Sequence, residues 1–248
     1  MITGIRLCVI IPTYNNDRTI LRVIEDVQKY VEHIIVVNDG STDETSEILH
    51  QVEQTVHIVS HERNKGKGSA LLSGIYAAKS KGYTHIITID ADGQHFASDI
   101  PVLLSALEHN PKGIIVGHRN LTETNMPRGN TFANKFSNFW FQLQTTINLP
   151  DTQSGYRLYA ISALKGLRWI TSRYESELEL LVFAAWAGKK ITSVPVKVYY
   201  PPTGERVSHF RPVYDFARIS ILNTILCVAA LFYGYPMLLV RKLVLFKQ

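Results

Sequence analysis

Residues 86–95 read IITIDADGQH, an apolar β-branched run that stops abruptly at acidic residues. Such a run, in which Thr88 alternates with isoleucines, is typical of a buried parallel strand, so Asp90 is expected at the strand's carboxyl end. If extended backbone continues through Asp92, then Asp90 and Asp92 point to the same side, with Ala91 between them. Two carboxylates in one small volume repel each other unless a cation neutralises them, and hard oxygen ligands suit Mg²⁺ or Mn²⁺. The pattern predicts a divalent metal site shared with substrate phosphates; the alternative is a plain acidic turn.

The composition suits one globular unit with anionic partners. The 248 residues are 46% hydrophobic and 19% charged, which supports one large α/β core or a domain with an appendage. The net charge of +5 favours nucleotides, lipid phosphates or an anionic membrane surface, and nucleic acid is not expected because no dense basic run occurs. Cys8 and Cys227 lie in apolar runs, which fits a reducing compartment. The apolar run before Pro12 is too short for a signal peptide, so the chain is expected to begin in the cytoplasm.

Strand and helix patterns alternate through the first half of the chain. Apolar runs predict strands at residues 7–11, 33–37, 56–59, 86–90 and 113–117. Helical periodicity fills the intervals, and Ser41 with Glu44 predicts a capping box that opens the helix after the second strand. This alternation predicts an α/β fold with a doubly wound, mostly parallel sheet and right-handed crossovers. Ligands bind such sheets beyond the carboxyl ends of the strands, where Tyr14, Asp39 and Asp90 are expected.

A glycine-rich segment, Gly66-Lys67-Gly68-Ser69, follows the third predicted strand. Because residue 61 is histidine and not glycine, the Walker spacing fails, and no Rossmann G-x-G-x-x-G follows a predicted strand. Glycines beside Lys67 at a helix N-terminus would still let backbone N–H groups approach a diphosphate. The alternative is a flexible turn with a solvated lysine.

Five sequence motifs occur in a definite order along the chain. They are IPTYNN at 11–16, VNDGSTDET at 37–45, NKGKGSAL at 64–71, DADGQH at 90–95 and DTQSGYRLY at 151–159. The series resembles family 2 glycosyltransferases of the GT-A fold, and within them the dolichyl- or polyprenyl-phosphate sugar transferases. The resemblance implies inverting transfer of a sugar from a nucleotide-sugar donor, a UDP- or GDP-sugar, with Mg²⁺ or Mn²⁺ as the cofactor.

The resemblance also implies roles for individual residues. The expected nucleotide-sugar-binding residues are Pro12, Thr13, Tyr14, Asn15, Asp39, Lys67, Asp90, Ala91, Asp92 and Gln94. The expected metal ligands are Asp90 and Asp92. The expected acceptor residues are Arg128, Gln153, Ser154, Arg157 and Arg206. The expected catalytic residues are Asp90, Asp92, Asp151 and Arg157.

The acceptor is either a phosphate or a hydroxyl, and protonation separates the two. A hydroxyl must lose its proton as it attacks, so it needs a general base, for which Asp151 is the candidate. A lipid phosphate is already anionic and needs positioning by cations such as Arg128 and Arg157, with Asp151 left to orient them or the loop. The resemblance favours polyprenyl phosphate, and a hydroxyl of a lipid, pigment or saccharide is the alternative. Residues 200–212 depart from the Arg, Ser and Lys spacing of that subfamily, so the role of Arg206 does not follow from it.

Other classes of protein fit less well. A nucleotidyltransferase needs a Gly-rich, Arg-containing N-terminal loop, where this chain has IPTYNN at 11–16. A noncatalytic membrane scaffold would not need both Asp90 and Asp92. The run KGLRW at 165–169 resembles the Q-x-x-R-W of processive synthases, but lysine replaces glutamine and the run precedes an acidic helix start at 174–177. A single, nonprocessive transfer is therefore expected.

A predicted helix that begins near Phe132 carries an aromatic stripe. Its members recur along one face and are Phe132, Phe136, Phe139, Trp140 and Leu143. Such a stripe is more typical of core packing than of lipid contact, although the basic loop before it favours a membrane interface.

The C-terminal segment is the second apolar feature. Residues 219–240 include no charged residue, and Arg218 and Arg241 flank them. This is roughly the 20 residues that cross a bilayer. We expect a GT-A domain at 1–212 and a membrane-associating helical segment at 213–248. This segment is expected to hold the enzyme at the cytoplasmic face of the membrane, as a peripheral, re-entrant or single-span anchor. A homo-oligomer contact through this helix and burial in the core are the alternatives.

Overall fold

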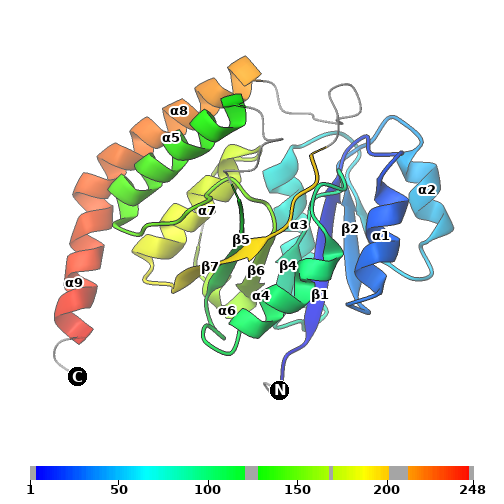
Figure 1. Ribbon diagram of the computed structural model, residues 1–248, viewed down its shortest axis with the longest axis horizontal. Helices are drawn as coiled ribbons and strands as arrows, with labels where there is room; N and C mark the ends of the chain where they lie inside the picture. Colours follow the sequence, from blue (N-terminus) through cyan, green and yellow to red (C-terminus); the bar gives the residue numbers. More distant parts are fainter. Residues whose placement is uncertain (1–3, 121–127, 168–169, 201–211, 246–248) are drawn as a thin grey trace.

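The computed structural model describes residues 4–120, 128–167, 170–200 and 212–245. Within them the strands form one sheet in the order β3-β2-β1-β4-β6-β5-β7 (Figure 1). The strands are β1 (Leu7–Thr13), β2 (Ile34–Asn38), β3 (His57–Ser60), β4 (His85–Thr88), β5 (Ile114–Arg119), β6 (Arg157–Ala160) and β7 (Ile191–Val196). Strand β6 runs antiparallel to both of its neighbours, β4 and β5, and the other pairings are parallel. The predicted doubly wound, mostly parallel α/β sheet is therefore confirmed.

Helices cover both faces of the sheet. They are α1 (Ile20–Gln28), α2 (Thr45–Gln51), α3 (Lys67–Ser80), α4 (Ile100–Ala106), α5 (Arg128–Thr145), α6 (Ile161–Leu164), α7 (Glu175–Trp186), α8 (Pro212–Ala229) and α9 (Tyr235–Leu245), with the short helices η1 (Ala97–Asp99) and η2 (Ala230–Gly234). Side chains alternate along β1, so Ile10 packs with α3 and α7 on one face, whereas Val9 and Ile11 pack with α1 and α4 on the other. Gly74 lets α3 lie close to the sheet, because a Cβ there would stand 2.5 Å from Cγ2 of Ile10.

The predicted capping box at Ser41 and Glu44 is wrong. Helix α2 begins at Thr45, and Asp43 binds its first backbone N–H instead, because Asp43 Oδ1 accepts from Thr45 N at 3.1 Å. Ser41 Oγ accepts a hydrogen bond from Asn15 N at 3.0 Å. Ser41 thus joins the loop after β2 to the loop after β1, which a local capping rule does not anticipate.

The C-terminal helices lie along the edge of the molecule, where α8 runs beside α5 and α9 continues away from it (Figure 1). A π-helical turn, η2, joins α8 to α9 immediately before Pro236, a residue with no N–H for the helical ladder. Arg218 Nη2 lies 2.6 Å from Glu175 Oε1, which ties α8 to the start of α7. The division at residue 212 into a domain and a segment stays a prediction.

Helices α5 and α8 bury polar side chains against each other in addition to apolar core residues such as Phe141 and Leu226. Gln144 of α5 and Asn223 of α8 are buried, and Gln144 Nε2 donates to Asn223 Oδ1 at 3.1 Å. Many other large apolar side chains of α5, α8, η2 and α9 are exposed: Phe139, Leu143, Ile221, Ile225, Val228, Leu231, Phe232, Tyr233, Leu239, Val240 and Leu243. The expectation that the aromatic stripe packs in the core is therefore wrong for Phe139 and Leu143. Core burial of the C-terminal segment is also excluded for these exposed residues.

Candidate functional site

The carboxyl edge of the sheet brings the sequence motifs together. Strands β1, β2 and β4 are parallel, so the loops that follow Thr13, Asn38 and Thr88 emerge at the same edge. Because β6 is antiparallel and pairs Arg157 with Thr88, the segment that leads into β6 approaches from this edge as well. The acidic loop after β4 therefore meets the motif at 151–159, although more than 60 residues separate Asp90 from that motif in sequence.

Lys67 is the centre of the site's ion pairs. It is the first residue of α3, and its Nζ lies 2.7 Å from Asp90 Oδ1 and 3.0 Å from Glu177 Oε2. Burial opposes ionisation of the Asp90 carboxyl, but the Lys67 ammonium outweighs this and holds the pKa of Asp90 below its ordinary value. Burial likewise opposes the charge on Lys67, but Asp90 and Glu177 raise the pKa of Lys67 above its ordinary value. Glu177 was not among the predicted site residues, although its place near a helix start was noted.

Asp92 carries the unfavourable charge. Burial and then the negative charge of Asp90 raise the pKa of Asp92 to about 6, while Gln94 N donates to Asp92 Oδ1 at 3.0 Å. The premise that extended backbone continues through Asp92 is wrong, because β4 ends at Thr88 and the chain turns at Ala91 and Asp92. The two carboxylates nevertheless interact, since a turn as well as a strand can bring side chains two positions apart together. A carboxylate whose pKa is raised by burial and a neighbouring carboxylate, as that of Asp92 is, is a group that a bound cation would stabilise in its charged form.

The residues fit a divalent cation whose remaining ligands come from a substrate. Among the described residues no group of three or more His, Cys, Asp and Glu side chains could hold a metal. Two carboxylates suffice for Mg²⁺ when water and substrate phosphates supply the remaining ligands. Gly155 leaves room at this point, because a Cβ there would stand 2.8 Å from Asp90 Oδ2 and 2.8 Å from Lys67 Nζ. Asp90 and Asp92 would hold the cation, with Gly155 forming the wall of its cradle.

The predicted donor residues of the first two loops mainly fasten the loops to each other. Thr13 is buried in β1, and Asn15, at φ 51°, accepts from Thr42 N through its Oδ1 at 2.8 Å. Pro12 is buried and Tyr14 half-buried at the same edge. Their contacts to a nucleotide stay predictions.

Asp39 shapes the loop that precedes α3. Its carboxylate is buried and accepts from Lys65 N at 2.9 Å and from Gly66 N at 2.7 Å. His61 Nδ1 lies 2.6 Å from Asp39 Oδ1, and His61 Nε2 lies 2.9 Å from Ser73 Oγ. Sequence reasoning missed His61, whose only signal was that it interrupted a Walker spacing. A role of Asp39 toward ribose stays a prediction.

Asp151 is buried and fully engaged. The Arg119 side chain donates to it twice, from Nε to Oδ2 at 2.7 Å and from Nη2 to Oδ1 at 3.0 Å, and Asn134 Nδ2 donates to Oδ1 at 2.5 Å. The backbone N–H groups of Gln153 and Ser154 also donate to Oδ1, each at 3.1 Å. Burial opposes the charge, but Arg119 outweighs it, so the pKa of Asp151 lies below its ordinary value. Such a carboxylate orients a loop and is a poor proton acceptor.

The prediction that Arg157 meets an acceptor phosphate is wrong. Its side chain is fully buried in β6. Its Nε donates to Ser154 O at 2.6 Å, Nη1 to Glu177 O at 2.8 Å and Nη2 to Thr152 O at 2.9 Å. Arg157 therefore joins the 151–155 loop to α7 from the interior and does not face solvent.

The other predicted residues lie as follows. Ala91 is buried and its carbonyl accepts from Thr19 Oγ1 at 2.6 Å, whereas Gln94 is half-buried and its carbonyl accepts from Tyr199 N at 2.8 Å. Gln153 is half-buried, and Ser154 is buried. Arg128 is the first residue of α5, and Arg206 lies outside the described residues.

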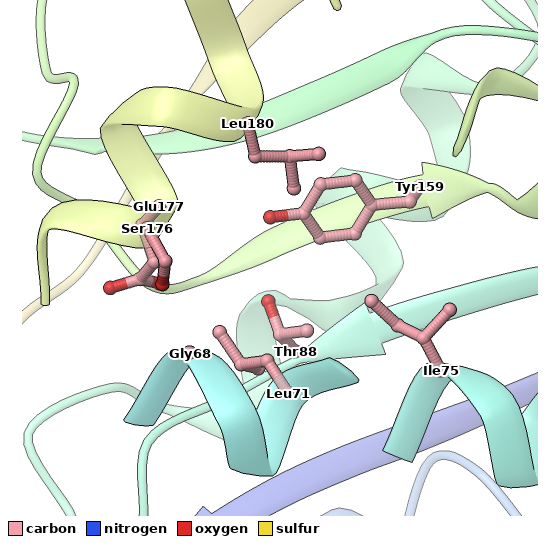
Figure 2. A pocket seen from close by; sticks show the side chains of 8 residues that line it. All are labelled: Gly68, Leu71, Ile75, Thr88, Tyr159, Ser176, Glu177 and Leu180. Atoms are coloured by element: carbon pink, nitrogen blue, oxygen red, sulfur yellow. The ribbon is translucent and has the colours of Figure 1, made fainter. Parts of the chain in front are cut away.

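A small cavity lies behind the ion cluster. Figure 2 shows it between α3, α7 and the ends of β4 and β6, with the side chains of Leu180, Tyr159 and Thr88 around it. Its volume of about 10 Å³ suits nothing larger than one water molecule. This cavity is therefore too small to hold a sugar or a nucleotide.

Comparison with known proteins agrees with this arrangement. The Glycosyl transferase family 2 profile matches residues 8–168, more than half of the chain. The UDP-N-acetylglucosamine--dolichyl-phosphate N-acetylglucosaminyltransferase of Methanococcus voltae is 34% identical over 212 residues, which cover 77% of this chain and 84% of that protein. The undecaprenyl-phosphate mannosyltransferase of Micrococcus luteus is 26% identical over 211 residues, covering 81% of this chain and 86% of that protein. The predicted family resemblance is confirmed.

A solved structure shows the same fold. The glucosyl-3-phosphoglycerate synthase of Mycobacterium tuberculosis, in complex with Mn²⁺, UDP and glucosyl-3-phosphoglycerate, superposes with a TM-score of 0.66 at 19% identity. The superposition covers 92% of this chain and 79% of that one. At this identity the likeness concerns the fold alone.

Proposed function

Since the chain belongs to glycosyl transferase family 2 and is a glycosyltransferase, we propose that it moves a sugar from a UDP- or GDP-sugar to a polyprenyl phosphate at a membrane surface. The observation that carries the proposal is the acidic loop at the carboxyl edge, where Asp90 and Asp92 lie beside Lys67. The relative from Methanococcus voltae has a UDP-sugar and a dolichyl phosphate in its name, and the one from Micrococcus luteus has undecaprenyl phosphate.

A divalent cation is part of the proposal. Asp90 and Asp92 would hold Mg²⁺ or Mn²⁺, which when bound neutralises the charge that develops on the leaving diphosphate. Support comes from the raised pKa of Asp92, which burial and Asp90 cause, and from the glycosyltransferase-fold neighbour that contains Mn²⁺ with UDP. The Lys67 ammonium adds a further positive charge at the same point.

A phosphate acceptor fits the site better than a hydroxyl. In an inverting transfer, an acceptor oxygen bonds to the anomeric carbon as the bond to the donor diphosphate breaks, and the electron pair leaves with the diphosphate. A phosphate oxygen is already anionic, so it needs positioning and no general base. Asp151, the candidate base for a hydroxyl, is buried and paired with Arg119, which supports the phosphate acceptor.

The outward apolar surface of α5, α8 and α9 supports a location at a membrane. Within the described chain, the stretch Tyr214–Arg241 is long and apolar enough to cross a membrane, and only 22% of its most apolar window is buried. Arg218 and Arg241 bracket the apolar residues, as basic residues do at an anionic cytoplasmic face. Because buried Gln144 and Asn223 fasten α8 to α5, an in-plane, interfacial position fits these helices better than a separate span. A homo-oligomer through the same surface is the alternative.

A transfer assay with matched acceptors tests the function. Purified protein receives UDP- and GDP-sugars, Mn²⁺ and either a short polyprenyl phosphate or the corresponding polyprenol. A thermal-shift screen of the nucleotides first selects the donor, because a ligand of the native state raises the melting temperature. Glycosylated product from the phosphate alone is expected. Equal or faster glycosylation of the polyprenol would establish the hydroxyl alternative and overturn the phosphate acceptor.

A further inference from the structure

Lys67 is shared between two acids that come from different elements. Asp90 follows β4, whereas Glu177 belongs to the first turn of α7, and both carboxylates lie within 3.0 Å of Lys67 Nζ. The Lys67 side chain is 15% exposed and that of Glu177 is 7% exposed, so water offers these charges little compensation. Glu177 is therefore an integral part of the charge balance at the acidic loop.

Glu177 also has unused capacity to accept hydrogen bonds. Its second oxygen, Oε1, is buried and has no hydrogen-bond partner. Its backbone is fixed, since Glu177 O accepts from Arg157 Nη1 at 2.8 Å. A buried carboxylate oxygen without a partner is rare and calls for an explanation. An ammonium that moved fully onto Glu177 would supply the missing donor, because Lys67 has three N–H groups.

A divalent cation on Asp90 would compete with Lys67. The ammonium lies 2.7 Å from Asp90 Oδ1 and 3.0 Å from Oδ2, so a divalent cation held by Asp90 would lie close to the Lys67 charge. A Mg²⁺–oxygen bond is about 2.0–2.1 Å long, and two cations cannot share one carboxylate at such distances without strong repulsion. Repulsion between the two cations would therefore favour movement of the Lys67 ammonium away from Asp90.

We propose that Glu177 is a positioning residue that retains the Lys67 ammonium when a divalent cation takes Asp90. Lys67 then stays beside the cation, with its charge directed to the donor diphosphate, and does not remain bound to the metal ligand. The inference rests on the proposed function, because it takes Asp90 and Asp92 as the metal ligands. In this arrangement Glu177 acts through Lys67 and touches neither the metal nor the sugar.

Mn²⁺ binding in the presence of UDP tests the proposal, because substrate phosphates complete the ligands of the cation. Unbound Mn²⁺ is measured by its electron paramagnetic resonance signal, with UDP alone as the blank. Lys67→Met removes the competitor and should tighten Mn²⁺ binding by about tenfold or more. Glu177→Gln leaves Lys67 with Asp90 alone and should weaken Mn²⁺ binding by a similar factor. The effect of Glu177→Gln should largely disappear when Lys67→Met is also present, because Glu177 acts through Lys67.

Glu175→Gln is the matched control. Glu175 is buried, lies on the same helical turn and pairs with Arg218 and not with Lys67, so its substitution should leave Mn²⁺ binding unchanged. Should Glu177→Gln weaken Mn²⁺ binding equally with and without Lys67, the residue acts as a simple charge and the proposal is overturned. If Lys67→Met binds Mn²⁺ more weakly than wild type, the proposal is also overturned, because Lys67 then does not compete with the cation for Asp90.

Two further observations separate this inference from the proposed metal site. If wild-type protein and Asp92→Asn take up equally little Mn²⁺, the metal site itself is wrong and the inference falls with it. If Asp92→Asn abolishes Mn²⁺ uptake but Lys67 and Glu177 variants bind normally, the metal site stands and only the inference fails. Should Lys67→Met not fold, wild-type protein labelled with ¹⁵N-lysine offers a second measurement: Mg²⁺ should shift the Lys67 ammonium signal, and an unshifted signal at saturating Mg²⁺ contradicts the proposal.

Discussion

Arg119 and Asp151 form a bidentate ion pair across 32 residues of sequence, with Nε 2.7 Å from Oδ2 and Nη2 3.0 Å from Oδ1. The pair joins the end of β5 to the motif at 151–159. Asp151→Asn should lower the free energy of unfolding by about 3 kcal/mol, as expected when one partner of a buried pair is removed. Urea unfolding measures this, and Asp26→Asn, in an exposed pair with Lys29, is the control that should change stability by less than about 1 kcal/mol.

The same pair predicts a dependence on pH. Arg119 holds the pKa of Asp151 below the ordinary value of 3.8 in spite of burial, so the unfolded state binds this proton more readily. The stability difference between wild type and Asp151→Asn should therefore be complete above about pH 4 and vanish as the pH falls further. A difference that grows on acidification would contradict the ion pair.

Turnover of Asp151→Asn should stay measurable where the fold persists, whereas loss of a general base would lower turnover about a hundredfold or more.

Asp92→Asn should separate function from stability. Burial and Asp90 raise the pKa of Asp92 to about 6, so its charge destabilises the folded protein above that pH. The variant should lose turnover and Mn²⁺-dependent nucleotide binding, yet melt at a higher temperature than wild type at pH 7. This gain should disappear below about pH 4, where both states are protonated. Melting curves at the two pH values and nucleotide titrations provide the check, and turnover that survives intact, or in excess EDTA, argues against the metal role.

Gly155→Ala should damage the site and spare the fold. The added methyl would lie 2.8 Å from Asp90 Oδ2 and Lys67 Nζ, both at the ends of flexible side chains that can move aside. Displacement of these charges should lower turnover about a hundredfold with little change in melting temperature. Gly166→Ala is the opposite control: nothing lies within 4 Å of its Cβ, but its φ of +80° strains alanine. That variant should lose about 1 kcal/mol of stability and keep its turnover.

Phe232→Lys should weaken membrane binding. Phe232 is 81% exposed on the outward apolar surface of η2 between α8 and α9. Loss of its burial in lipid should lower the partition coefficient onto anionic vesicles by about tenfold or more. Ile170→Lys is the matched control, because Ile170 is 87% exposed but lies outside this surface. Equal losses for both variants in a vesicle sedimentation assay, or full-length protein that is monomeric and does not bind vesicles, would exclude the proposed surface.

Arg157→Met should act on folding rather than on the acceptor. The guanidinium is fully buried and bonded to the carbonyls of Ser154, Glu177 and Thr152. Its removal takes one donor from each of these buried oxygens and should lower the free energy of unfolding by about 3 kcal/mol. Urea unfolding measures the loss. A variant as stable as wild type with selectively impaired acceptor use would restore the original assignment to the acceptor phosphate.

Local pattern in the sequence determined the sheet and the edge where the site lies. Each of the predicted strands 7–11, 33–37, 56–59, 86–90 and 113–117 overlaps a strand of the structure, because period-two and helical periodicities are properties of neighbouring residues. Polar residues that follow parallel strands collect at one edge of the sheet, so the sequence alone predicts the place of Asp39, Asp90 and Asp92. The motif series likewise determined the family, since its order along the chain needs no tertiary information.

Only the tertiary structure decided which charges meet. Arg157 faces the interior because the antiparallel register of β6 against β4 turns it there, and sequence spacing carries no register. Lys67 pairs with Asp90 and Glu177 because α3 and α7 bring their first turns together across more than 100 residues. The burial of Gln144 in α5 depends on tertiary structure for the same reason: Gln144 is buried because Asn223 of α8 lies opposite it. Burial and pairing depend on partners distant in sequence, and a single segment does not encode those partners.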